Sequence, residues 1–336
     1  MRPVPSASLL LAIVLALAGT VLPARAKTSP TGKATMTDYR ALEKTIRDTW
    51  DFHDPSTSEK RFVAMLDSVG GDAAALAIVH TQVARAQALQ RRFDDANATL
   101  DTVATQVKTL PAGRPAMHAQ ARLDIERGRA LNSGGDPGRA RPLFEQAFTE
   151  ADSAGQAALA VDAAHMVAIA AGNDSAASDA LAWNERALAM AESSNDPEAR
   201  KWRASLLNNL GWTYHEAKDY DKALALFERA LAARKEMGDE RNTREARWCV
   251  ARCLRSLGRL DEALAQQQAL EKECAAAKEP DGYVFEELGE ILYAQGKPED
   301  AKPWFGKAFD ELNADPFIRN DEPDRVARLL KLSGRP

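Results

Sequence analysis

A recurring spacing of small and large residues constrains this chain more than any other feature. Six times, a small residue is followed twelve residues later by alanine. A third matched position comes four residues after the alanine, and a fourth comes three residues after the third. The small residues are Ala84, Gly128, Ala168, Gly211, Ala251 and Gly289, and the alanines are Ala96, Ala140, Ala180, Ala223, Ala263 and Ala301. The third positions are Leu100, Phe144, Asn184, Phe227, Gln267 and Phe305, and the fourth are Val103, Ala147, Ala187, Ala230, Leu270 and Ala308. Small residues let two antiparallel helices approach closely, and a large residue fills the space beside them.

Turn-forming segments separate the paired columns, for example Lys218 to Asp219, Leu257 to Arg259 and Gly296 to Pro298. Such segments end a helix, and aspartate or serine often caps the next one. Alanine is abundant and runs of alternating β-branched residues are essentially absent, which favours helices. We therefore predict an all-α solenoid of six antiparallel helix hairpins. The expected repeats lie within 71–316, at about 77–110, 121–154, 161–194, 204–237, 244–277 and 282–315.

The residue pattern resembles the tetratricopeptide repeat, most strongly in the three repeats around Gly128, Gly211 and Gly289. The matching residues are Leu210, Gly211, Tyr214, Tyr220, Ala223, Phe227 and Ala230, and then Leu288, Gly289, Ala301, Phe305 and Ala308. The resemblance extends from near Leu76 to Pro316, although Asn184 and Gln267 stand where a large apolar residue is usual. It implies a right-handed superhelix that binds a peptide or protein segment on its concave side, without catalysis or a cofactor.

The repeats are longer than the usual length of about 34 residues. Successive matched alanines lie 44, 40, 43, 40 and 38 residues apart. This is similar to the long repeats of kinesin light chains and bacterial regulators. Helical spacing also predicts a divergent helix pair at 37–70, capping the N-terminal end of the array, and a C-terminal capping helix within 317–336, at Pro323 to Leu332.

Candidate ligand-binding residues follow from the helical period. In such solenoids the first helices line the concave wall, and their inner strip falls three residues before, one after and four after the small residue. With the positions one turn earlier, this selects His165, Asn208, Trp212, His215, Trp248, Arg252, Arg255, Tyr283, Glu286, Glu290 and Arg129. Trp, Tyr and Arg dominate binding hot spots, so we predict a ligand-binding groove there. The alternative is that Trp212 and Trp248 pack against neighbouring helices and the arginines are merely solvated.

Two other functions stay open beside the binding scaffold. The protein could be an envelope assembly adaptor that uses its convex face or its ends. It could also be a hydrolase or metal-dependent enzyme with His165 and His215 in the groove, but no second histidine follows His215-Glu216 at metal-binding spacing, and no phosphate loop or paired-cysteine site appears. Cys249, Cys253 and Cys274 are expected to be small packing residues, and one disulfide among them is the alternative in an exported protein.

Charge and the N-terminus bear on partners and location. Arg2 precedes an apolar run from Leu9 to Leu22, and Ala24 and Ala26 supply the small residues of a cleavage site. We predict a signal peptide at 1–26, a flexible linker at 27–36 and a periplasmic or secreted protein without a stable membrane span; an uncleaved inner-membrane anchor is the alternative. Cleavage removes two of the 44 basic residues, leaving 42 against 49 acidic ones, or −7. Such a charge disfavours nucleic acid as a partner.

Overall fold

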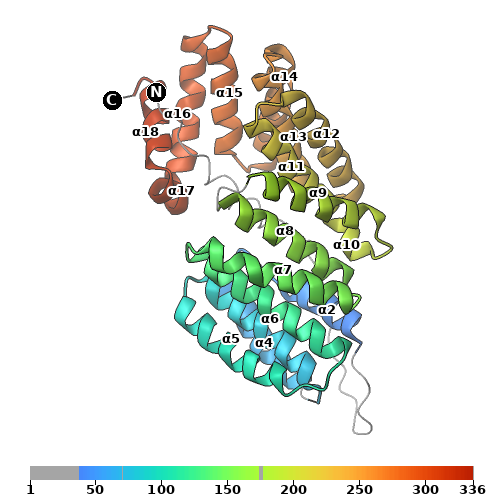
Figure 1. Ribbon diagram of the computed structural model, residues 1–336. Helices are drawn as coiled ribbons and strands as arrows, with labels where there is room; N and C mark the ends of the chain where they lie inside the picture. Colours follow the sequence, from blue (N-terminus) through green and yellow to red (C-terminus); the bar gives the residue numbers. More distant parts are fainter. Residues whose placement is uncertain (1–37, 70, 174–176, 336) are drawn as a thin grey trace. The chain divides into compact units, whose positions relative to one another are not determined.

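Every element in the described part of the chain is an α-helix, which confirms the predicted all-α fold. The computed structural model describes residues 38–69, 71–173 and 177–335 (Figure 1). The expected signal peptide and linker therefore lie outside the described residues.

Six helix hairpins follow one another along the chain. They pair α4 (Ala73–Leu89) with α5 (Phe93–Lys108), α6 (Arg114–Ser133) with α7 (Pro137–Ser153), α8 (Ala157–Asn173) with α9 (Ala177–Ser193), α11 (Arg203–Glu216) with α12 (Tyr220–Met237), α13 (Glu240–Ser256) with α14 (Leu260–Ala277), and α15 (Gly282–Ala294) with α16 (Pro298–Ala314). The other helices within the described residues are α2 (Tyr39–Thr49), α3 (Pro55–Ser68), α10 (Pro197–Lys201), α17 (Pro316–Asp321) and α18 (Pro323–Leu332). The sequence pattern did not indicate α10 and α17.

Aspartate side chains start many of these helices. Each accepts hydrogen bonds from backbone N–H groups of the first turn, which have no partner inside the helix. The capping residues are Asp38, Asp54, Asp72, Asp136, Asp196, Asp219, Asp239 and Asp281. The turn chemistry expected from the sequence therefore sets many of the helix boundaries.

Each glycine in the first column lies against the phenylalanine sixteen residues later. A Cβ atom added to Gly211 would lie 2.6 Å from the ring of Phe227, and Gly128 and Gly289 face Phe144 and Phe305 in the same way. All three rings are essentially buried. The predicted close approach of the two helices of a hairpin is thus observed where glycine and phenylalanine meet.

The chain divides into two compact units, and the boundary falls between Leu206 and Leu207 inside α11. The N-terminal unit runs to Leu206 and has hydrophobic clusters around Phe62 and Phe144. The C-terminal unit begins at Leu207 and has clusters around Phe227, Leu270 and Phe305.

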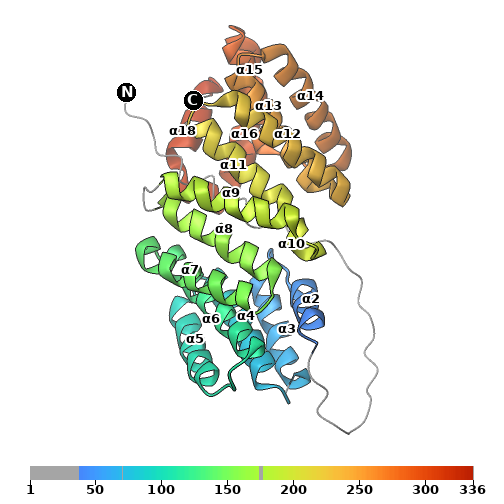
Figure 2. The same ribbon diagram turned by 45° about the vertical axis from the view of Figure 1, so that its right-hand side comes forward.

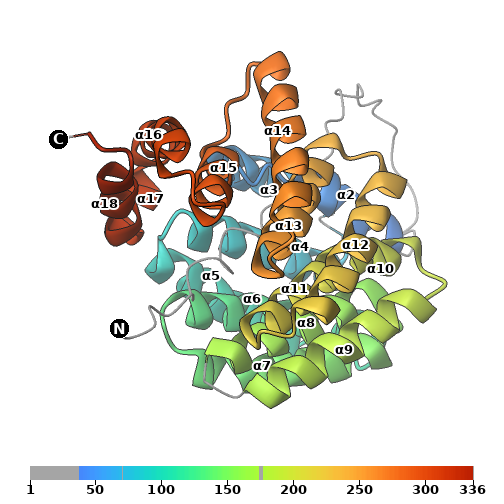
Figure 3. The same cartoon turned by 90° about the horizontal axis from the view of Figure 1, so that it is seen from above.

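The helices outside the hairpins differ in how they pack. In the N-terminal unit α3 packs against α4, as a capping helix would, whereas α2 lies beside both α3 and α4 (Figure 2). In the C-terminal unit α18 packs against α16, the second helix of the last hairpin (Figure 3). Within the described residues, no helix is long and apolar enough to cross a membrane.

Candidate functional site

The predicted strip is distributed over both units. We define the first-helix face of the N-terminal unit as the sides of α4, α6 and α8 that carry the predicted strip positions. The first-helix face of the C-terminal unit consists of the corresponding sides of α11, α13 and α15. Arg129 and His165 belong to the former, and the other nine predicted residues belong to the latter.

A ladder of ion pairs connects successive first helices in the N-terminal unit. The guanidinium of Arg129 on α6 binds Glu126 at 2.6 Å and Asp162 of α8 at 2.6 and 2.8 Å. Arg85 of α4 lies 3.7 Å from Glu126. Burial disfavours the charged form of Arg129, but Asp162 and Glu126 outweigh it and raise the pKa of its guanidinium. Arg129 is therefore engaged in two ion pairs within the unit.

His165 is buried in the same face. Its ring lies 5.5 Å from the ring of Trp202, which follows the short helix α10. Burial lowers the pKa of His165 to about 4, with Asp162 opposing and Arg129 adding to the effect. The imidazole is thus neutral at physiological pH, and only 4% of the residue is exposed.

Helix α2 supplies a carboxylate to this face. Glu43 accepts hydrogen bonds from Arg122 of α6, with Nε 3.0 Å away, and its Oε1 lies 2.6 Å from Nε2 of His118. Burial opposes ionisation of Glu43, but Arg122 and His118 outweigh it and hold the pKa of the carboxyl well below its usual range. The first-helix face of the N-terminal unit is therefore filled by side chains of the unit itself.

A series of aromatic rings runs along the first helices of the C-terminal unit. The ring of Trp248 on α13 lies 6.0 Å from Trp212 on α11 and 6.2 Å from Tyr283 on α15. Trp212 is only 6% exposed and packs 5.1 Å from Phe227, so the packing interpretation holds for this residue. Asn208 is also buried, whereas Trp248 and Tyr283 are half-buried. Trp248 donates its Nε1 hydrogen to the Tyr283 carbonyl at 3.1 Å.

Polar side chains border the aromatic series. Arg255 binds the buried carboxylate of Glu287 at 2.5 and 3.1 Å, and Arg252 lies 3.6 Å from the same carboxylate. Burial raises the pKa of Glu287 to about 7, against the attraction of Arg255. His215 lies 2.8 Å from the Ser256 hydroxyl, and burial, with Arg255 nearby, lowers the pKa of its imidazole. Arg252 is the most accessible of these charges, with about 32% of its side chain exposed.

The two glutamates of α15 interact with the C-terminal helix. Arg325 of α18 binds Glu286 through Nε at 3.0 Å and lies over the ring of Tyr283, and Arg328 of α18 lies 2.5 Å from Glu290. The three arginines of the predicted strip, Arg129, Arg252 and Arg255, therefore lie beside carboxylates of their own unit and are not merely solvated. The sequence pattern did not predict the roles of Glu43, His118, Glu287 and the arginines of α18, although charges at i and i+3 on successive first helices could have indicated the ladder.

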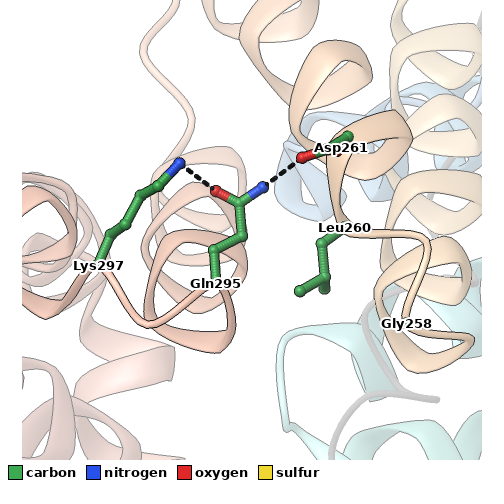
Figure 4. A pocket seen from close by; sticks show the side chains of 5 residues that line it. All are labelled: Gly258, Leu260, Asp261, Gln295 and Lys297. Carbon is green, nitrogen blue, oxygen red and sulfur yellow. Dashed lines mark hydrogen bonds between the residues drawn. The ribbon is translucent and has the colours of Figure 1, made fainter.

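The other candidate sites offer few groups that could bind a metal or react. Among the described residues, no group of three or more His, Cys, Asp or Glu side chains is arranged to hold a metal ion. The three cysteines are buried and form no disulfide with one another, and the Cys253 thiol donates a hydrogen bond to the Tyr220 carbonyl at 3.3 Å. A shallow hollow of about 390 Å³ lies between the turns that follow α13 and α15 (Figure 4). Gln295 in this hollow donates to Asp261 at 2.8 Å and accepts from Lys297 at 3.0 Å, so these polar groups join two hairpins.

Comparison with known families and structures supports the repeat assignment. The tetratricopeptide repeat model matches residues 177–236, which include α9 and most of α12. A search of curated protein sequences finds no significant match. The family match and the six hairpins together indicate that the chain contains tetratricopeptide-like repeats.

Solved structures share the fold at low sequence identity. The apo form of RapI aligns with a TM-score of 0.67 and 12% identity, covering 88% of this chain and 79% of RapI. A STAND signal-transduction ATPase with a tetratricopeptide repeat sensor from Pyrococcus horikoshii aligns with a TM-score of 0.64 and 12% identity, covering 86% of this chain and 45% of that protein. BtubC from P. vanneervenii has a TM-score of 0.55 and 17% identity, with coverage of 71% and 92%.

Proposed function

We propose that this tetratricopeptide repeat protein is a non-catalytic scaffold that binds a peptide or protein segment on the first-helix face of its C-terminal unit. The aromatic series Trp212, Trp248 and Tyr283, bordered by Arg252, is the observation that carries the proposal. Partly buried rings next to a directed guanidinium combine large contact area with polar selectivity. Protein partners are also the usual ligands of such repeats.

The location of the open surface favours this unit over the other. In the N-terminal unit, Arg129 and His165 are enclosed by ion pairs and by Trp202. In the C-terminal unit Trp248, Arg252 and His215 are each partly exposed. A peptide could contact these three side chains without first breaking the Arg255–Glu287 pair. We therefore reduce the predicted contact set to Trp248, Arg252, His215 and Tyr283, with Trp212 and Asn208 supporting them from beneath.

The test uses peptides selected from a random library on the full-length chain. We expect at least one selected peptide to lose about ten-fold or more in affinity when His215→Ala and Arg252→Ala are combined, because both side chains are partly exposed on the first-helix face of the C-terminal unit. Arg247→Ala is the matched control, because Arg247 lies on the same helix and instead binds Glu273 of α14 at 2.6 Å. The affinity is measured by isothermal titration calorimetry.

Two results would contradict the proposal. One is that no peptide is enriched on the full chain. The other is that selected peptides bind the double variant as tightly as they bind the Arg247→Ala control. If peptide binding is unchanged and changes in the ends of the array instead disrupt an assembly, the adaptor function replaces the scaffold function.

We also propose that the chain is exported. The support is the apolar run from Leu9 to Leu22 with Ala24 and Ala26 after it, all outside the described residues. Mass spectrometry of the protein recovered from a bacterial periplasmic fraction should then give an N-terminus at Lys27. An intact Met1 in a membrane fraction would instead support the anchored form.

A further inference from the structure

Helix α2 binds the first-helix face of the N-terminal unit through one side of its surface. The Tyr39 hydroxyl donates to Asp72 at 2.9 Å, and its ring lies 5.6 Å from the ring of His118. One turn later Glu43 meets Arg122 and His118. Just beyond the end of the helix, Trp50 donates from Nε1 to Gln82 of α4 at 3.0 Å. Tyr39, Glu43 and Trp50 therefore contact α4, α6 and the residue that caps α4.

The same side of α2 carries its apolar contacts. Leu42 and Ile46 are buried together with Glu43, whereas Arg40, Lys44 and Asp48 on the other side are exposed. This is the pattern of an amphipathic helix that binds a receptor surface through anchors one turn apart. A free helix of eleven residues is only marginally stable in water, so the face on which α2 lies supports its helical form.

The receptor side needs a carboxylate. Glu43 is the ion-pair partner that the described residues offer Arg122, since Glu126 and Asp162 are bound by Arg129. Arg122 and His118 are both at least nine-tenths buried. Without Glu43, a buried guanidinium would lie beside Arg85 and Arg129 with too few carboxylates nearby, which is strongly unfavourable. The charge of this face is therefore complementary to a helix that carries a carboxylate on its buried side, as α2 carries Glu43.

We propose that the first-helix face of the N-terminal unit is a second binding site, for an amphipathic helix of a partner protein that carries a carboxylate on its buried side, and that α2 is its resident occupant. A partner helix would place an aromatic residue on His118, a carboxylate on Arg122 four residues later, and apolar residues on the side facing α4. The Arg47–Glu198 ion pair, 3.0 Å long, links α2 to α10 and is released when α2 leaves. This site is independent of the surface proposed in the C-terminal unit.

The site is tested with a fluorescent peptide that copies residues Asp38 to Trp50, added to the full-length chain. In the variant Tyr39→Ala/Glu43→Ala, the tethered helix is weakened and the receptor residues are unchanged. We expect this variant to bind the peptide at least about ten-fold more tightly than the wild-type chain does, because a tethered occupant competes at an effective concentration of about millimolar. Fluorescence anisotropy reports the affinity.

Two controls tie any binding to the carboxylate. A peptide with Glu43→Gln should bind the weakened variant at least about ten-fold less tightly, because Arg122 would lack its charged partner. Adding Arg122→Ala to the variant should remove the preference between the two peptides. Equal affinity of the two peptides for the weakened variant, or no binding of either, would overturn the proposal.

A second design covers the case in which the weakened variant does not fold. A protease recognition sequence is inserted next to His53 in the turn between α2 and α3, and the full-length wild-type chain is cut there. The labelled peptide should then exchange with the cut helix, while the Glu43→Gln peptide should not. Failure of the labelled peptide to enter the cut protein would overturn the proposal, as would reciprocal exchange of α2 between two copies of the chain without peptide uptake.

Discussion

At the scale of single residues, packing within a hairpin depends on which small residue faces which large one. Gly211 faces Phe227, and a Cβ at Gly211 would lie 2.6 Å from the ring. In the first hairpin, the same positions hold Ala84 and Leu100, both buried. We therefore expect Gly211→Ala to lower the free energy of unfolding by about 1–3 kcal/mol through overpacking. Chemical denaturation followed by circular dichroism measures the change.

The first hairpin supplies the control for this prediction. Adding Phe227→Leu to Gly211→Ala copies the Ala84 and Leu100 pair, and part of the lost stability should return although Phe227→Leu alone removes buried surface. Additive losses in the double variant would show that the two positions do not share one packing space.

A substitution of Gln267 should raise the stability of the protein. Gln267 occupies the column of Phe227 and Leu100 and is completely buried, and neither its amide nitrogen nor its amide oxygen has a hydrogen-bond partner among the described residues. Replacing a buried unpaired polar group by an apolar one of similar size removes its desolvation penalty. Gln267→Leu should therefore raise the thermal midpoint, by about 1–2 kcal/mol in free energy of unfolding. Gln267→Ala, which leaves a cavity, should not; a lower midpoint for the leucine variant would contradict the argument.

At this scale the sequence predicted packing well and interactions poorly. The small-residue columns follow from spacing within one hairpin, which helical geometry fixes locally. The partners of Arg129, Arg255 and Glu286 are 32 to 39 residues away, on the next first helix or on α18. Helical periodicity shows which side of a helix such a residue occupies, but not whether a neighbouring helix neutralises it. The expected free arginines are therefore ion-paired.

At the scale of elements, the hairpin of α6 and α7 contains two carboxyls that resist ionisation. Burial raises the pKa of Asp124 to about 6, with Gln120 and Arg127 opposing. Burial also raises the pKa of Glu150 to about 7, with Gln146 opposing and Asp124 adding repulsion. In the unfolded chain these carboxyls have pKa values of about 4. The folded hairpin therefore binds more protons than the unfolded chain between about pH 4 and 7. These two groups should make the N-terminal unit more stable as the pH falls through that window.

The variant Glu150→Gln separates the contribution of this carboxyl to the pH dependence of stability from the contribution of the histidines of the same unit. Burial lowers the pKa values of His80 and His165, and neutral buried histidines lose stability as the pH falls below about 6.5. Both histidines are present in wild type and variant, so the difference between the two proteins reports the carboxyl. Urea unfolding at about pH 5 and pH 7.5 should show that the variant gains less, or loses more, stability on acidification than wild type. An identical pH dependence of the two would refute the assignment.

Element order was predictable where a turn signal accompanied the helical period. The bounds of α18, from Pro323 to Leu332, are those that the proline and the glycine at Gly334 indicate. The short helix α10 follows a serine- and asparagine-rich connection and has no period of its own, so it was missed. Because α10 positions Trp202 over His165, that omission made His165 appear accessible. The position of α2 was also missed, because it depends on the contact between Glu43 and Arg122. These two residues are 79 positions apart in the sequence.

At the scale of the whole chain, extensive helix contacts join elements that are close in sequence, such as α6 with α7, α7 with α8 and α13 with α14. In such an array a local defect should be felt mainly by its neighbours. Phe144 is completely buried in a cluster with Met166 and Val167 of α8, and its replacement by alanine should cost about 3–5 kcal/mol. Hydrogen exchange should then accelerate in α6, α7 and α8, where the lost ring leaves a cavity.

The rate of hydrogen exchange in α13 to α18 shows whether unfolding of the two units is coupled. If the N-terminal unit opens by itself, Phe144→Ala should leave exchange in the C-terminal unit within error of wild type, as local opening requires. Phe305→Ala is the reciprocal variant, because Phe305 occupies the same column in the last hairpin and is equally buried. It should accelerate exchange in α15, α16 and α18 and spare α4 to α7. Uniform acceleration along the chain in both variants would mean that the division into units has no energetic counterpart, and that unfolding is a single cooperative event.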